Sequence, residues 1–427
     1  MVEKGGVVTQ QEAGLTAVGR VFCVPYQLLY QLVDQKHITD LSKIHKDPPK
    51  IKGTDWSVTL NMGKPNTHST RMALFQIVLI ALLAPLTTSL QIGPLLSTCV
   101  DACQRGCQEI RNVQAAREQT GTDSGLKVEF KDVSDPRSAL TEADNAAHRA
   151  IVGALRAEWG DQLRIVGEED GDEDLAKSIS AMTFKALKRD LFEDDLGDMA
   201  DVDPALITVF VDPLDGTREF VEGRLTSCQV LVGIAIEGES FAGAVGIPFP
   251  DGDLSSESTI VYGVADIGTG ILGTPLKRGP FPLDRNIDGV KYPRPQHATG
   301  DSTDEVMKAC RERAISRFGG SNVIYGGAGN KILAAALGEV ACSIQHKVGG
   351  PWDLCAPEAI LKAMGGKMTD LFGEEIQIYK DDAPPRCNER GYLASPPGSA
   401  HLFHEALAAS LLVLPEVQTY RNEVIPK

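Results

Sequence analysis

The chain has little positive charge to offer a polyanionic partner. Its 427 residues include 42 Lys and Arg against 58 Asp and Glu, so its formal net charge is −16. No basic field is available to replace the counterions of a phosphate backbone, which argues against a nucleic-acid partner and against adhesion to an anionic membrane surface. A small anionic substrate remains compatible with this balance, provided that metal ions supply the positive charge.

The sequence also lacks the cysteine pattern of a disulfide scaffold. Its nine cysteines are odd in number, spread over a long chain and mostly set among apolar residues. Cys99, Cys103 and Cys107 recur at every fourth position and would share one face of a helix. Because no histidine and no further cysteine lies near them in sequence, we interpret them as small core residues rather than as a metal site.

No apolar run of membrane-spanning length stands out. The conspicuous run, 73–87, is 15 residues long, whereas a spanning helix needs about 20. It resembles the hydrophobic part of a signal peptide. Three interpretations stay open: translation starts at Met72, residues 1–71 precede a signal anchor, or the run is a buried helix. We expect residues 72–91 to direct the protein to an organelle or the secretory route, with a cytoplasmic location as the alternative.

Three parts of the chain differ in pattern, as suits a length of two or three domains at about 150 residues each. Residues 1–91 are an N-terminal extension that contains the apolar run. Residues 92–275 are predicted to form an α+β domain, because apolar runs closed by turn residues indicate an antiparallel sheet. Residues 276–427 alternate helical segments with short strands, which is typical of a smaller α/β domain.

Residue periodicity predicts the individual elements. Helices are expected over 94–114, 140–159, 304–318, 330–338, 356–364 and 400–412. Strands are expected over 164–166, 207–211, 228–236, 241–247, 259–262, 323–325, 341–345 and 367–369. The string GTGILG at 268–273 matches a dinucleotide-binding pattern, but Pro275 follows at once and no helix opens there. We interpret these glycines as part of a sheet.

Residues 168–203 form an acidic insert with 13 acidic and 4 basic side chains. More than half of the excess negative charge of the chain is therefore concentrated there. We interpret the insert as a solvated surface excursion rather than as a recognition element.

Two carboxylates three residues apart follow a continuous apolar strand. Asp212 and Asp215 stand in the stretch VDPLDGT, in which Pro213 fixes φ and Gly216 permits a tight turn. A carboxylate beyond the end of a buried strand points into a crevice, and two such groups repel one another. A divalent cation relieves that repulsion, so the stretch predicts a metal site.

Three other acidic residues stand at comparable places. Glu168 follows a short strand directly, and Asp144 lies at the start of a helix. Asp353 precedes a predicted helix whose first turn would hold Pro357. There it could cap the helix, or meet an anion or a metal.

Together these elements resemble the signature of the inositol monophosphatase superfamily, the lithium-sensitive, magnesium-dependent phosphomonoesterases. The resemblance covers about residues 92–415, and within the superfamily it is greatest to the 3′(2′),5′-bisphosphate nucleotidases. It is carried by VDPLDGTREFVEG (211–223), VLVGIAIEGESFAGAVGIP (230–248), GGAGNK (326–331) and WDLCAPEAILKAMGGKMTD (352–370). It implies a layered αβαβα sandwich with an antiparallel sheet followed by a smaller α/β part that completes the active site.

The resemblance also implies roles for individual residues. Two or three Mg²⁺ ions would be held by Glu168, Asp212, Asp215, Asp353 and the carbonyl of Leu214. Asp144 and Thr217 would orient or deprotonate the attacking water. Substrate would be contacted by Gly216, Thr217, Lys331 and Asp353. The family usually has a Ser-His-Ser stretch upstream, where this chain has Gly300-Asp301-Ser302 with His297 close by, so the substrate contact at this point stays open.

The expected function is therefore magnesium-dependent, lithium-sensitive hydrolysis of the 3′ (or 2′) phosphate of adenosine 3′,5′-bisphosphate, which gives AMP and phosphate. The alternative is an inositol polyphosphate 1-phosphatase or inositol monophosphatase activity, because the metal-binding residues would be shared. A scaffold with a decayed site is disfavoured, since every residue of the metal signature is present together with Thr217 and Asp144. The expected partner is a small nucleotide bisphosphate or inositol phosphate, with membrane contact only through the apolar segment.

Overall fold

The computed structural model describes residues 89–120, 128–130, 139–169, 191–278, 283–287, 290–293, 295–347, 349–380, 388–398 and 400–425. The contacts of the chain separate Met1–Thr87 from Thr88–Lys427, and all the described residues belong to the second unit. The apolar run 73–87 and most of the acidic insert lie outside the described residues. Within them, no helix has the length and apolarity needed to cross a membrane.

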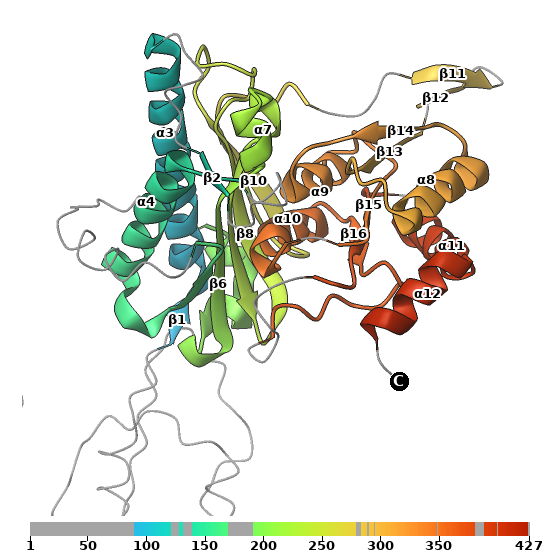
Figure 1. Ribbon diagram of the computed structural model, residues 1–427. Helices are drawn as coiled ribbons and strands as arrows, with labels where there is room; N and C mark the ends of the chain where they lie inside the picture. Colours follow the sequence, from blue (N-terminus) through green and yellow to red (C-terminus); the bar gives the residue numbers. More distant parts are fainter. Residues whose placement is uncertain are drawn as a thin grey trace, which may run out of the picture. The chain divides into compact units, whose positions relative to one another are not determined.

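A six-stranded sheet contains β6, the strand in which Asp212 and Asp215 lie (Figure 1). Its strand order is β10-β9-β8-β7-β6-β4, and every neighbouring pair is antiparallel except β4 and β6. Strands β6 and β7 are buried along their whole length, as expected of strands covered on both faces. The strands are β4 (Arg164–Gly167), β6 (Ile207–Asp215), β7 (Gln229–Ile236), β8 (Glu239–Ile247), β9 (Thr259–Val264) and β10 (Gly268–Gly273).

Helices α3 (Ile92–Thr120) and α4 (Glu142–Trp159) pack on each other and against this sheet. The three cysteines at fourfold spacing on α3 are fully buried, which confirms their interpretation as core residues. The Cys103 thiol donates to the carbonyl of Ala244 in β8 at 3.3 Å. Burial raises the pKa of this thiol, so it stays neutral.

Helices α9 (Ala328–Ala336) and α10 (Pro351–Ala363) contact strands of the same sheet. Their buried side chains belong to a second apolar cluster, separate from the cluster that α3 and α4 form. A Cβ at Gly243 of β8 would lie 2.6 Å from the backbone of Ala356, so only glycine lets α10 approach this closely. The two helix pairs therefore cover opposite faces of the six-stranded sheet.

A five-stranded sheet of order β14-β13-β15-β17-β16 forms the next layer. It contacts α9 and α10 as well as α8 (Glu305–Phe318) and α11 (Ala400–Leu412), and α12 (Pro415–Val424) packs on α8. The predicted αβαβα layering is thereby confirmed. The strands are β13 (Gln296–Thr299), β14 (Ser321–Ile324), β15 (Cys342–Gln345), β16 (Lys367–Thr369) and β17 (Tyr392–Ser395).

Short elements complete the described chain. Three strand pairs are formed by β1 (Leu90–Gln91) with β5 (Asp201–Val202), β2 (Val128–Phe130) with β3 (Ala139–Thr141), and β11 (Leu283–Ile287) with β12 (Val290–Pro293). Two short helices are α6 (Glu193–Leu196) and α7 (Thr217–Val221).

Two sequence-based boundaries near the signature are wrong. Strand β6 continues through Asp215 instead of ending at residue 211, because a register shift against β7 accommodates the Pro-containing stretch. Helix α10 begins at Pro351 rather than at 356, so Asp353 lies within its first turn and Pro357 lies inside the helix. By contrast, the GTGILG string is strand β10, as predicted. The proposed division of the chain at residues 275 and 276 stays a prediction.

Candidate active site

The end of strand β6 holds the two carboxylates of the signature. Asp212 Oδ1 accepts a hydrogen bond from the backbone N–H of Leu214 at 3.0 Å, which fixes the side chain against its own strand. Both Asp212 and Asp215 are buried. The backbone N–H of Glu168 donates to the carbonyl of Val211, so the residue after β4 lies beside the residue before Asp212.

Asp215 is held by the N-terminus of α9. Its carboxylate accepts hydrogen bonds from the backbone N–H groups of Ala328 and Gly329, both at 2.9 Å. A Cβ at Gly327, whose φ is +74°, would lie 2.6 Å from Asp215 Oδ2. Glycine is therefore required where the GGAGNK stretch passes over this carboxylate.

Asp353 enters from α10. Its Oδ2 accepts a hydrogen bond from the backbone N–H of Gly350 at 2.7 Å, just before the helix begins. Each of Asp212, Asp215 and Asp353 offers one carboxylate oxygen, and these three oxygens lie within 4.8 Å of one another. Residues far apart in sequence thus form one acidic cluster.

The cluster is electrostatically costly without a cation. Burial raises the pKa of Asp212 and of Asp353, and the charge of Glu168 adds to both shifts. Burial raises the pKa of Asp215 to about 6, against the opposing charge of Lys331. All these ligand atoms are hard oxygens, which suit Mg²⁺ or a similar divalent ion, so the residues fit the metal site that the signature predicts.

Asp144 and Thr217 form a hydrogen-bonded pair beside the cluster. Thr217 Oγ1 lies 2.8 Å from Asp144 Oδ1 and 3.0 Å from the carbonyl oxygen of Leu214. The hydroxyl carries one proton, so it donates to one of these two acceptors at a time. Asp144 Oδ2 also accepts hydrogen bonds from Thr141, from its N–H at 2.7 Å and from its hydroxyl at 2.6 Å. Burial raises the pKa of Asp144 to about 6 despite these bonds.

Lys331 lies in the first turn of α9 with its amino group buried. The amino group donates to the carbonyl of Gly327 at 2.6 Å. Burial lowers the pKa of Lys331, and the charge of Asp215 is the largest influence that opposes this shift. Gly216, at φ +90°, precedes α7, and a Cβ there would lie 3.0 Å from the carbonyl oxygen of Ser227.

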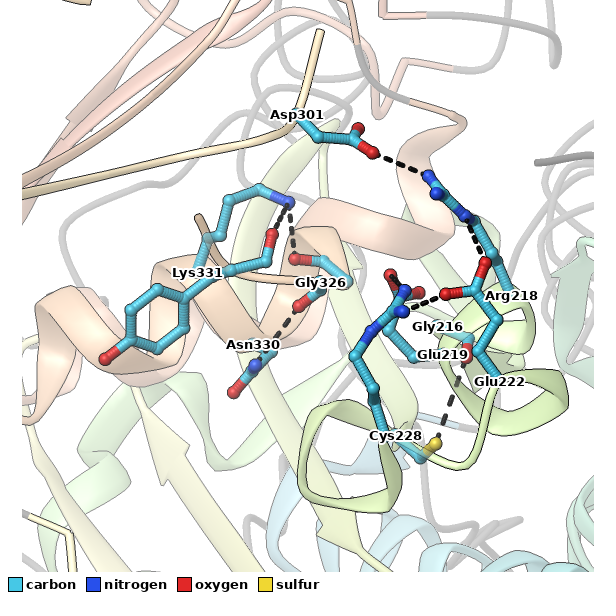
Figure 2. Close-up of polar contacts among 12 residues, drawn as sticks. Gly216, Arg218, Glu219, Glu222, Cys228, Asp301, Gly326, Asn330 and Lys331 are labelled. Carbon is cyan, nitrogen blue, oxygen red and sulfur yellow. Dashed lines mark hydrogen bonds and ion pairs between the residues drawn. The ribbon is translucent and has the colours of Figure 1, made fainter. Parts of the chain in front are cut away.

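A pair of charged residues next to Thr217 was not predicted from the sequence. Arg218 donates from Nη1 to Asp301 Oδ2 at 2.6 Å (Figure 2). Two signals could have pointed to it: Arg218 directly follows Thr217, and Asp301 stands in the stretch that departs from the family pattern. His297 lies elsewhere. It is buried in β13, with Nδ1 3.2 Å from the Cys342 sulfur and Nε2 2.9 Å from the Gly319 carbonyl oxygen.

A family model for the inositol monophosphatase family matches residues 94–412. The chain belongs to the inositol monophosphatase family. Membership places it among the phosphoric monoester hydrolases, and the enzymes of this family use divalent metals. The acidic cluster is the place where the described residues offer ligands for such an ion.

Two relatives and one solved structure illustrate the likeness. The 3′(2′),5′-bisphosphate nucleotidase 1 of Homo sapiens is 33% identical over 273 residues, which cover 60% of this chain and 78% of that protein. The Golgi-resident adenosine 3′,5′-bisphosphate 3′-phosphatase of Bos taurus is 29% identical, with coverage of 74% and 79%. The extragenic suppressor protein suhB of Bartonella henselae superimposes with a TM-score of 0.50 at 16% identity, covering 74% of this chain and 96% of its own. That last likeness shows the fold alone.

Proposed function

We propose that this member of the inositol monophosphatase family is a 3′(2′),5′-bisphosphate nucleotidase that hydrolyses the 3′ phosphate of adenosine 3′,5′-bisphosphate, or the 2′ phosphate of the 2′,5′ isomer. The reaction class is carried by one observation: the hydrogen-bonded pair Thr217–Asp144 beside three clustered carboxylates. The substrate is supported by the names of two relatives, a bisphosphate nucleotidase and an adenosine bisphosphate phosphatase.

The proposed ligands for two or three Mg²⁺ ions are the carboxylates of the acidic cluster, Glu168 and the Leu214 carbonyl. When bound, these ions would neutralise charge on the transferring phosphoryl group and lower the pKa of the attacking water. Without such ions the carboxylates repel one another, because each raises the cost of ionising its neighbours.

Thr217 and Asp144 would handle the proton of the attacking water. The Thr217 hydroxyl oxygen accepts the water proton while its own proton passes to Asp144 Oδ1. With a pKa of about 6, Asp144 is ionised at neutral pH and close to the range in which a base both accepts and releases a proton readily. Asp144 Oδ1, at 2.8 Å, is the nearer of the two acceptors that face this hydroxyl, the other being the Leu214 carbonyl oxygen at 3.0 Å.

The bond changes are then complete. The water oxygen bonds to phosphorus, and the bond between phosphorus and the ribose oxygen breaks. That oxygen takes up a proton from solvent to become a hydroxyl, and Asp144 releases to solvent the proton that it received. The products are AMP and inorganic phosphate. Gly216, Thr217, Lys331 and Asp353 are the proposed substrate contacts.

The test is phosphate release from adenosine 3′,5′-bisphosphate beside inositol 1,4-bisphosphate and inositol monophosphate at equal magnesium. Preference for the nucleotide supports the proposal. Preference for either inositol phosphate supports the alternative activity within the family, which the shared carboxylate cluster also allows. Asp144→Asn serves as the inactive control, because an amide cannot take the proton from Thr217.

We also propose that residues 72–91 direct the protein to an organelle or the secretory route. The Golgi location in the name of one relative supports this proposal. The full chain and a version starting at Ile92, each fused to a fluorescent tag, provide the test. The same diffuse cytosolic signal from both would contradict it.

A further inference from the structure

An ion pair connects two parts of the chain beside Thr217. Arg218 belongs to α7, which follows a strand of the six-stranded sheet, whereas Asp301 follows β13 of the five-stranded sheet. The guanidinium of Arg218 contacts the Asp301 carboxylate at 2.6 Å and that of Glu222 at 2.9 Å. The pair, drawn in Figure 2, therefore joins segments that belong to two different layers, and Arg218 directly follows Thr217 in the sequence.

Asp301 is within electrostatic reach of a second cation. The carboxylates whose charge raises the pKa of Lys331 include Asp301. In Figure 2 the amino group of Lys331 and the guanidinium of Arg218 both lie on the side of the view where Asp301 is drawn. Asp301 thus pairs with one cation and acts electrostatically on a second, Lys331, on which Asp215 and Asp353 of the acidic cluster also act.

Arg218 is the cation of these two that can change partner. The side chains of Arg218 and Asp301 are 32% and 53% exposed, and ion pairs at such exposure contribute little stability. Lys331 instead is buried and its amino group already donates to the carbonyl of Gly327. The planar guanidinium of arginine also suits a phosphate group, to which it can donate two parallel hydrogen bonds.

A bisphosphate substrate brings a requirement that a monophosphate lacks. One phosphate must lie at the acidic cluster, and the second, attached to the same ribose, carries negative charge into a neighbourhood rich in carboxylates. Glu219 and Glu222 are both close to Arg218 and are paired with Arg224. The second phosphate therefore needs a cation whose existing ion pair is weak enough to be exchanged for an ion pair with the phosphate.

We propose that Arg218 determines substrate specificity by binding the second phosphate of a bisphosphate substrate, and that Asp301 is the internal anion that this phosphate displaces. This inference rests on the proposed function. It makes Asp301 a competitor of the substrate, so the removal of its charge strengthens the binding of a bisphosphate.

Steady-state kinetics of three variants on two substrates provide the test. The substrates are adenosine 3′,5′-bisphosphate and adenosine 3′-monophosphate, which lacks the second phosphate. Arg218→Gln is expected to lower kcat/KM for the bisphosphate by about tenfold to a hundredfold, the range of a hydrogen bond to a charged group, mainly through KM. The value for the monophosphate should change much less. Asp301→Asn should lower KM for the bisphosphate alone, an improvement that a folding defect cannot produce.

Arg224→Gln is the matched control. It removes an exposed arginine from the same segment, one whose ion pairs are with Glu219 and Glu222 instead of Asp301. The ratio of the two kcat/KM values should stay at the wild-type level in this variant. An equal change for both substrates in Arg218→Gln, or a raised KM for the bisphosphate in Asp301→Asn, refutes the inference while leaving the nucleotidase proposal intact. A wild-type enzyme that releases no phosphate from the bisphosphate refutes both.

Discussion

Asp144 should make the metal-free protein less stable as the pH rises from 5 to 7. Its folded-state pKa is about 6, raised from an ordinary value of 3.8 by burial. Because the pKa of this carboxyl is higher in the folded than in the unfolded protein, folding favours its protonated form. Its contribution to the free energy of unfolding is therefore fully present below the unfolded pKa and is lost as the pH rises through the folded pKa. Between pH 5 and pH 7 this single group should cost about 1 kcal/mol of unfolding free energy.

The assay is urea unfolding of wild type and Asp144→Asn in the presence of a chelator at both pH values. The comparison with the variant is essential, because burial lowers the pKa of His297 and gives that residue the opposite pH dependence in the same window. Wild type should lose about 1 kcal/mol relative to Asp144→Asn, whose amide does not titrate. Parallel stability changes in the two proteins would refute the reasoning. Saturating magnesium should reverse the wild-type trend, since ions bind the ionised carboxylates and stabilise the folded state by mass action.

Three further outcomes are expected. Asp212→Asn should reduce phosphate release at least about tenfold, because the loss of a metal ligand costs this much or more. In the absence of metal, thermal unfolding should show the variant to be at least as stable as wild type, because one buried charge repulsion is removed. Activity above a tenth of wild type speaks against the ligand role. Lithium should inhibit phosphate release at sub-saturating magnesium, and calcium should inhibit it because the larger and looser coordination shell of calcium misplaces the water. Rates measured over a matrix of ion concentrations test both expectations. Insensitivity to lithium would contradict the lithium sensitivity that is expected of the family. Arg117 of α3 donates to the carbonyls of Phe220 and Val221 at the end of α7, at 3.0 and 3.1 Å. Arg117→Ala should therefore lower kcat by loosening the helix that begins with Thr217. Added guanidinium should restore part of kcat, and no rescue would indicate a general folding defect.

The local chemistry of the site could be predicted from sequence because its signals are short-range. The VDPLDGT stretch joins an apolar strand, a fixed proline φ and a glycine turn within seven residues, so Asp212 and Asp215 were recognisable without any tertiary information. Strand β4 and the start of α4 were equally readable from periodicity. Roles assigned to these residues stay predictions until they are tested by substitution.

The tertiary relations could not be read in this way. The 2.9 Å hydrogen bonds from α9 to Asp215 join residues 113 and 114 positions apart, and periodicity carries no signal for such a contact. The start of α10 was misjudged because two prolines compete for the first helical turn, and Pro351 rather than Pro357 takes that place. The pair Arg218–Asp301 also depends on how two sheets meet.

The distribution of the carboxylates along the chain has a consequence for folding. The cluster takes Asp212 and Asp215 from one strand but Asp353 from a helix that is synthesised much later. During synthesis from the N-terminus, the first two carboxylates are therefore complete before their partner exists. Asp353 must then form a contact of large sequence separation with them, and such contacts are slow to form. The contact also has to form against the repulsion between the carboxylates. Divalent ions should accelerate this late docking step, so refolding rates measured with and without magnesium would report on the order in which the layers assemble.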